Sequence, residues 1–167
     1  MEILVQAPDR LAFQGRAHLC VIGRGGIRAR KREGDGVTPA GVFPLRRLLY
    51  RADRLEIPQT GLAVAALSPG DGWCDDAGHA DYNRQVTLPH PASCEELWRD
   101  DGIYDLVVVL GHNDAPVVAG AGSAIFLHLA RPDFSPTAGC VALARSDLLE
   151  ILEACDPASR IRIEASD

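Results

Sequence analysis

A histidine and a cysteine, His128 and Cys140, stand at a spacing that suits covalent chemistry. His128 lies near the end of an apolar run with β-branched and aromatic members, Ser123 to Leu129, which predicts a strand. Prolines at 132 and 136 block a helix in the segment that follows, and Gly139 allows a tight turn directly before the cysteine. Closing a loop of this length costs only about 2 kcal/mol, so we expect the two side chains to lie side by side.

A thiol beside an imidazole suits nucleophilic catalysis. A free thiol has a pKa of about 8.5, so little of it is thiolate at neutral pH, and an adjacent imidazole can remove its proton. Gly139 has no Cβ to hold a substrate carbonyl away from the backbone, and amide groups nearby are candidate donors to an oxyanion. The alternative is that His128 is a core histidine and Cys140 a small buried apolar residue.

The other cysteines leave a metal site to be weighed. Five cysteines are present, an odd number with no disulfide-framework spacing, so at least one is unpaired, and we assign Cys140 as that thiol. Zinc held by Cys74, His79, His128 and Cys140 has suitable ligand types. No Cys-x-x-Cys or His-x-x-x-His spacing supports it, so we predict neither a metal nor a cofactor.

Several motifs together resemble one enzyme family. Ser-Ala-Ile-Phe-Leu-His over 123–128 and Pro-Thr-Ala-Gly-Cys-Val-Ala-Leu over 136–143 resemble the catalytic signature of the L,D-transpeptidases, the cysteine-dependent peptidoglycan enzymes with a YkuD-type domain. The block 31–43 is similar to the family's Lys-x-x-Gly-Asp-x-x-Thr-Pro-x-Gly-x-Phe/Tyr pattern. Gly-Trp-Cys-Asp-Asp over 72–76 and Asp-Tyr-Asn-Arg over 81–84 resemble a short, single-domain proteobacterial branch. Thr-Ala-Gly-Cys stands where the family more often has Ser/Thr-His-Gly-Cys.

The resemblance implies a two-step acyl transfer at Cys140, with His128 as base and Gly139 beside the oxyanion. The thiol would form a thioester with a donor stem peptide of peptidoglycan and pass it to the side-chain amine of meso-diaminopimelate, as a 3-3 or a 1-3 cross-link. The open alternatives are hydrolysis of stem peptides, as an L,D-carboxypeptidase or endopeptidase, and a peptide-binding module with an inert thiol. The resemblance also implies a location in the periplasm or cell envelope.

Candidate substrate contacts come from loops, where binding residues gather. A polar and aromatic cluster on irregular backbone contains Trp73, Asp75, His79, Tyr82, Asn83 and Arg84, and its alternative is a surface loop pinned by a buried tryptophan. Arg131 suits a substrate carboxylate, and an internal ion pair in its Arg-Pro-Asp turn is an equal alternative. The residues predicted to contact substrate are Arg131, Thr137, Ser123, Tyr82, Asn83, Trp73 and Thr38.

Composition limits the class of protein. A length of 167 residues, 47% hydrophobic and 24% charged, indicates one globular domain over 1–167. A net charge of −6 argues against nucleic acid and gives no attraction to an anionic membrane. No run approaches the roughly 20 apolar residues of a membrane span, and no secretory signal is visible at Met1 to Gln6. We expect a monomer.

The pattern of apolar residues predicts a mainly β fold, a β-sandwich or strongly bent mixed sheet with a few short helices. Valine-rich Ile103 to Leu110 is expected to be a central strand buried on both faces. The glycines at 23–26 predict a hairpin turn. Further strands are expected at Met1 to Gln6, Arg16 to Gly23 and Arg160 to Glu164, a strand or short helix at Val42 to Leu49, and helices at Pro91 to Arg99 (capped by Ser93) and from Ser146 to about Ala154.

Overall fold

The computed structural model describes residues 1–165, and this part of the chain folds mainly into strands with one short helix. The strands are β1 Glu2–Gln6, β2 Arg10–Phe13, β3 Arg16–Val21, β4 Ile27–Arg28, β5 Thr38–Pro39, β6 Gly41–Tyr50, β7 Val64–Ala66, β8 Asp71–Cys74, β9 Gln85–Thr87, β10 Cys94–Glu96, β11 Leu106–Leu110, β12 Phe126–Leu129, β13 Val141–Leu143 and β14 Arg160–Glu164. The helix is α1 Arg145–Glu153.

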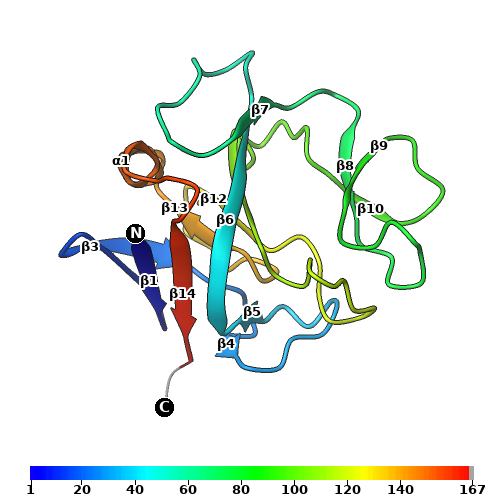
Figure 1. The fold of residues 1–167 in the computed structure, drawn as a ribbon, viewed down its shortest axis with the longest axis horizontal. Helices are drawn as coiled ribbons and strands as arrows, with labels where there is room; N and C mark the ends of the chain where they lie inside the picture. Colours follow the sequence, from blue (N-terminus) through cyan, green and yellow to red (C-terminus); the bar gives the residue numbers. More distant parts are fainter. Residues whose placement is uncertain (166–167) are drawn as a thin grey trace.

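The largest sheet is mixed, strongly bent and closed on itself. Its strands follow the order β11-β12-β13-β3-β2-β1-β14-β6-β7, and β11 also pairs with β6. The ten-residue strand β6 closes the ring because its first half pairs with β14 and its second half with β11. Figure 1 shows β6 beside β14. The predicted bent mixed sheet is confirmed, and it forms a barrel-like ring.

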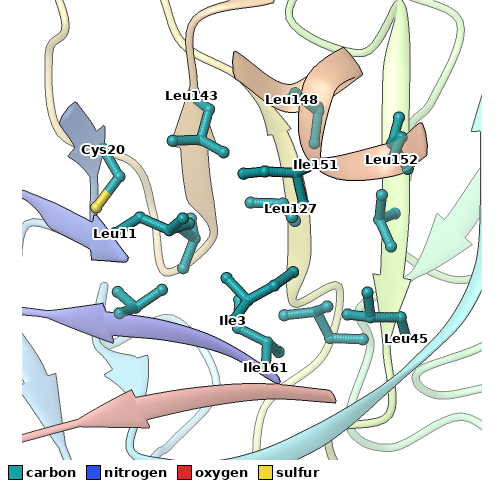
Figure 2. Close-up of a cluster of buried hydrophobic side chains, with 14 of the residues drawn as sticks. Ile3, Leu11, Cys20, Leu45, Leu127, Leu143, Leu148, Ile151, Leu152 and Ile161 are labelled. Carbon is teal, nitrogen blue, oxygen red and sulfur yellow. The ribbon is translucent and has the colours of Figure 1, made fainter. Parts of the chain in front are cut away.

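The main core fills this ring. Strand residues alternate between the two faces of a sheet, and Leu127 and Leu129 of β12 and Val141 and Leu143 of β13 point inward. Helix α1 covers one end of the ring with Leu148, Ile151 and Leu152 (Figure 2). Each such side chain contributes about 1.5–3 kcal/mol when fully buried.

A second apolar cluster lies on the outer face of β11 and β12. It contains Val107, Val109 and Phe126 from these strands, Trp73 from the smaller three-stranded sheet β10-β8-β9, and Leu97, which directly follows β10. Figure 1 shows this sheet to one side of the ring. All five residues of β11 are buried, so the prediction of a central strand buried on both faces is confirmed.

Two local predictions are wrong. The segment Pro91 to Arg99 contains strand β10 instead of a helix, because Cys94–Glu96 pair with β8 and the Ser93 carbonyl accepts a hydrogen bond from the Asp75 amide. The glycines at 23–26 do not join a hairpin. The strands on either side, β3 and β4, pair with other partners.

The predicted C-terminal helix is confirmed, with a different start. Helix α1 begins at Arg145, with Ala144 as the N-cap residue and no side-chain cap hydrogen bond, so Ser146 lies inside the helix. Asp147 in the first turn complements the helix dipole. Within residues 1–165, no helix has the length and hydrophobicity needed to cross a membrane.

Candidate active site

The parallel pair of strands β12 and β13 positions the candidate nucleophile, Cys140, and the candidate base, His128. Leu127 is in register with Val141 and His128 with Ala142, which sets Cys140 beside Phe126. Since Leu127 and Val141 point into the ring, His128 and Cys140 lie on the opposite face of the sheet. Both line a cleft of about 520 Å³. The structure therefore brings the two residues into one cleft, and within residues 1–165 no hydrogen bond joins the Cys140 sulfur to the His128 ring.

Cys140 is held in place through its sulfur. The Sγ atom donates a hydrogen bond to the carbonyl of Ala124 (3.1 Å) and accepts one from the amide of Phe126 (3.4 Å). The residue is 8% exposed, at the floor of the cleft. Burial, assisted by the negative charge of Glu95, raises the pKa of the Cys140 thiol to about 12. The resting group is the neutral thiol.

His128 is neutral for the same reason. It is 5% exposed, and Tyr104 packs edge-on against its ring with the centroids 5.1 Å apart. Burial lowers its pKa to about 4. Its Nδ1 lies 2.9 Å from the carbonyl oxygen of Leu129. Because a carbonyl only accepts, this contact assigns the ring hydrogen to Nδ1 and leaves the lone pair of Nε2 to take up a proton.

The turn before the nucleophile is fixed by Thr137 and Gly139. The Thr137 hydroxyl donates to the Cys140 carbonyl (2.6 Å) and accepts from the Gly139 amide (3.1 Å). Gly139 has φ +142°, and a Cβ there would lie 2.9 Å from the Val37 carbonyl oxygen, so no other residue fits without strain. Within residues 1–165, no acceptor is bonded to the Cys140 amide, which is the free N–H beside the sulfur.

The cleft carries charges of both signs. Lys31 Nζ is bound to Asp35, and the Lys31 side chain is 5% exposed. Glu95 accepts a hydrogen bond from Tyr104, and burial raises the pKa of its carboxyl group. The Oδ1 atom of Asp75 is buried with no hydrogen-bond partner within residues 1–165. The charged residues lining the cleft are Arg24, Lys31, Arg99 and Arg131 together with Glu33, Asp75 and Glu95.

Comparison with known proteins fits this geometry. The family model of the L,D-transpeptidase catalytic domain, YkuD, matches residues 2–163. The chain belongs to the L,D-transpeptidase family. No curated protein and no solved structure matches it. At the level of the family, this L,D-transpeptidase domain is that of a peptidoglycan-modifying enzyme, a class typical of the cell envelope.

The L,D-transpeptidase cleft is lined by six of the predicted site residues: Cys140, His128, Gly139, Arg131, Thr137 and Ser123. Arg131 forms an ion pair with Asp101 at 3.4 Å and is nearly half exposed, so its guanidinium can also reach solutes. The Ser123 hydroxyl donates to Glu33 (2.8 Å). Gly139 and its neighbouring amides were predicted to hold an oxyanion. The Gly139 amide already donates to Thr137, so among these amides that of Cys140 is the better candidate donor.

The four remaining residues predicted to contact substrate do not line the cleft. Asn83 accepts from Trp73 Nε1 (3.0 Å) and the Ala124 amide (3.1 Å), and its own amide donates to the carbonyls of His112 (3.0 Å) and Asn113 (2.8 Å). It therefore joins the small sheet to the strand that leads to His128.

Tyr82 and Thr38 also have partners within the protein. The Tyr82 hydroxyl donates to Glu33 and accepts from the Gly122 amide (3.0 Å). Thr38 is fully buried and accepts from the amide of Gly23 (2.8 Å). These side chains support the walls of the cleft from behind.

The cleft residues that sequence reasoning missed are the carboxylates Glu33 and Glu95, whereas Asp75 belonged to the predicted polar cluster without being chosen as a substrate contact. Asp75 and Glu95 directly follow Cys74 and Cys94, which belong to strands of three or four residues. Alternation over so few residues is too short to predict from the sequence which face of the sheet a side chain occupies. The structure also argues against the zinc site that was weighed as an alternative. His128 and Cys140 lie in the cleft, whereas Cys74 lies opposite Cys94 in the small sheet, so the four suggested ligands are not assembled.

Proposed function

We propose that this protein is a cysteine-dependent acyltransferase that cross-links peptidoglycan stem peptides, with Cys140 as nucleophile and His128 as general base. The observation that carries the proposal is the arrival of a thiol and an imidazole in one cleft from adjacent strands of an L,D-transpeptidase domain. Proximity of this kind replaces a bimolecular encounter and supplies much of the rate enhancement.

The resting pair is neutral, and this determines how the first step runs. The pKa of Cys140 is about 12 and that of His128 about 4. Burial disfavours the charged form of both groups, so moving the proton from sulfur to Nε2 before substrate binds is unfavourable. We infer that proton transfer accompanies attack: as the S–C bond forms, the thiol proton moves to His128 and the carbonyl oxygen becomes an oxyanion near the Cys140 amide.

The remaining steps return both groups to their starting state. His128 gives its proton to the departing amine as the donor's C–N bond breaks, and a thioester remains on Cys140. An acceptor amine attacks that thioester, loses a proton to His128 and forms the new amide bond. Sulfur leaves and regains the proton from His128, so no cofactor is consumed.

The charges in the cleft match the two substrates. A stem peptide carries carboxylates, which Arg24 and Arg131 are placed to attract, whereas the acceptor carries an ammonium group. Asp75 and Glu95 supply negative charge for that group, and an ammonium beside Glu95 would counter the burial that raises its pKa. We place this reaction in the cell envelope, performed by a monomer, with no part for nucleic acid or for membrane insertion.

The test is to incubate purified muropeptides with the wild type, with Cys140→Ala and with Cys155→Ala, a matched control at another buried cysteine, and to analyse the products by mass spectrometry. We expect cross-linked dimers from the wild type and from Cys155→Ala, and none from Cys140→Ala. Fragmentation of the dimer identifies the bond, 3-3 or 1-3. Shortened monomers in place of dimers would mean an L,D-carboxypeptidase or endopeptidase. Products that persist in Cys140→Ala would refute the catalytic role of the thiol.

A further inference from the structure

Two cysteines face each other across the small sheet, outside the active-site cleft. Cys74 of β8 is directly opposite Cys94 of β10. The backbone of Cys74 bonds to Arg84 and Asn83 on its other side, so the two cysteines form a pair without hydrogen bonds between them. Opposed side chains approach most closely in such pairs. Both thiols are free, with Cys74 fully buried and Cys94 half-buried.

Histidines and a carboxylate complete the cluster. The ligand atoms of Cys74, Cys94 and His90 all lie within 4.8 Å of one another. His90 also belongs to a second such group, in which Asp81 Oδ2 lies 3.2 Å from His90 Nε2 and 3.6 Å from His79 Nδ1. The small sheet thus gathers two thiols, two imidazoles and one carboxylate at a single place.

We propose that this cluster binds one Zn²⁺ ion through Cys74, Cys94 and His90, with a fourth ligand from the His79–Asp81 pair. Sulfur and imidazole nitrogen are the ligands that zinc prefers, and a closed tetrahedral set is the structural kind of zinc site. Ligand atoms on one zinc ion stand roughly 3.3–3.8 Å apart. The ligand atoms of Cys74, Cys94 and His90, all within 4.8 Å of one another, therefore need to approach one another by at most about 1.5 Å to share an ion.

The site has both an entrance and a structural purpose. An open groove lined by Gly70, His90 and Cys94 leads to it from solvent. The sheet it would brace is small, with strands of three or four residues, and such short strands need additional support. The inference goes beyond the proposed acyl transfer. It assigns no catalytic step to the metal, and its failure would leave the roles of Cys140 and His128 unchanged.

The placement also links the metal to the cleft. Asp75 and Glu95 directly follow Cys74 and Cys94, and side chains alternate along a strand. The cysteines lie on the face with His90, while the two carboxylates line the cleft. An ion that holds the cysteines therefore fixes the backbone from which these carboxylates project.

The experiment is metal analysis of the full chain, purified without a histidine tag from medium containing zinc. We expect one equivalent of zinc in the wild type, and at least a tenfold lower content in Cys94→Ser and His90→Ala. Cys155→Ala serves as the control because it removes a buried thiol elsewhere, and it should keep its zinc. Chelated wild type titrated with Co²⁺ should show a thiolate-to-cobalt charge-transfer band, absent in Cys94→Ser.

Two results would overturn the proposal. One is an intact mass two hydrogens below the reduced chain, with peptide mapping that joins Cys74 to Cys94, because a disulfide would consume both thiolates. The other is wild-type protein that is reduced and free of zinc and gives no cobalt band. The cobalt titration needs only the wild type, so the test holds even where a variant fails to fold.

Discussion

Acid should destabilise this protein through His128 in particular. The ring is almost completely buried, and its pKa falls from the usual 6.5 to about 4, chiefly because burial disfavours the charged form. In the unfolded chain the same ring is exposed and titrates near its usual value. Folding therefore favours the neutral imidazole.

Proton linkage predicts that the folded protein loses stability as the pH falls. Between pH 6.5 and about 4 the unfolded state binds more protons than the folded state, so stability present at pH 7 is lost as the pH falls through this window. For a single group with these two pKa values, the loss amounts to about 2 kcal/mol by pH 5 and about 3 kcal/mol by pH 4. The loss levels off below pH 4.

The assay is urea unfolding followed by tryptophan fluorescence, for the wild type and for His128→Gln, at a series of pH values from 7 to 4. Carboxylates titrate in both proteins, so the difference between the two unfolding free energies isolates His128. We expect the advantage of the wild type over the variant to shrink by about 3 kcal/mol over this range. Parallel curves would refute the assignment of a buried neutral imidazole.

Three substitutions test the hydrogen bonds and the backbone geometry that surround Cys140. Asn83→Ala leaves the indole N–H of Trp73 and other buried groups without partners, and should lower the free energy of unfolding by about 3 kcal/mol or more in denaturant melts. Gly139→Ala forces a Cβ to 2.9 Å from the Val37 carbonyl oxygen at a positive φ. It should cost about 1–3 kcal/mol and abolish dimer formation in the muropeptide assay, and an active variant would contradict the turn geometry. Thr137→Val removes two hydrogen bonds that shape the turn, and should lower kcat with little change in KM, whereas a change confined to KM would instead indicate substrate contact.

The sequence predicted the parts of the site that depend on local chain geometry. Prolines and glycine around Cys140 indicated a loop that returns to the strand of His128, and the parallel pairing of β12 and β13 confirms it. Period-two alternation likewise identified the strand Arg160–Glu164. Both patterns depend only on residues that are close in the sequence, so they can be recognised without knowledge of the fold.

The features that the sequence did not predict depend on contacts with residues distant in the sequence. Asn83 is polar and sits in a loop, which predicted a substrate contact, yet all four hydrogen bonds of its side chain go to other segments of the chain. The segment around Ser93 has the residues of a helix start, but pairing with β8 makes it a strand. In strands of three residues, cross-strand pairing outweighs local preference.

The register of β12 and β13 separates the alignment of His128 and Cys140 from the shaping of the cleft wall. Backbone pairing between the strands aligns His128 with Cys140, so their alignment does not depend on the length of the excursion over residues 131–136 that connects them. Arg131, Ser135 and Pro136 in that excursion border the cleft. Evolution or engineering can therefore rebuild this stretch to reshape one wall of the cleft, and leave His128 and Cys140 where they are.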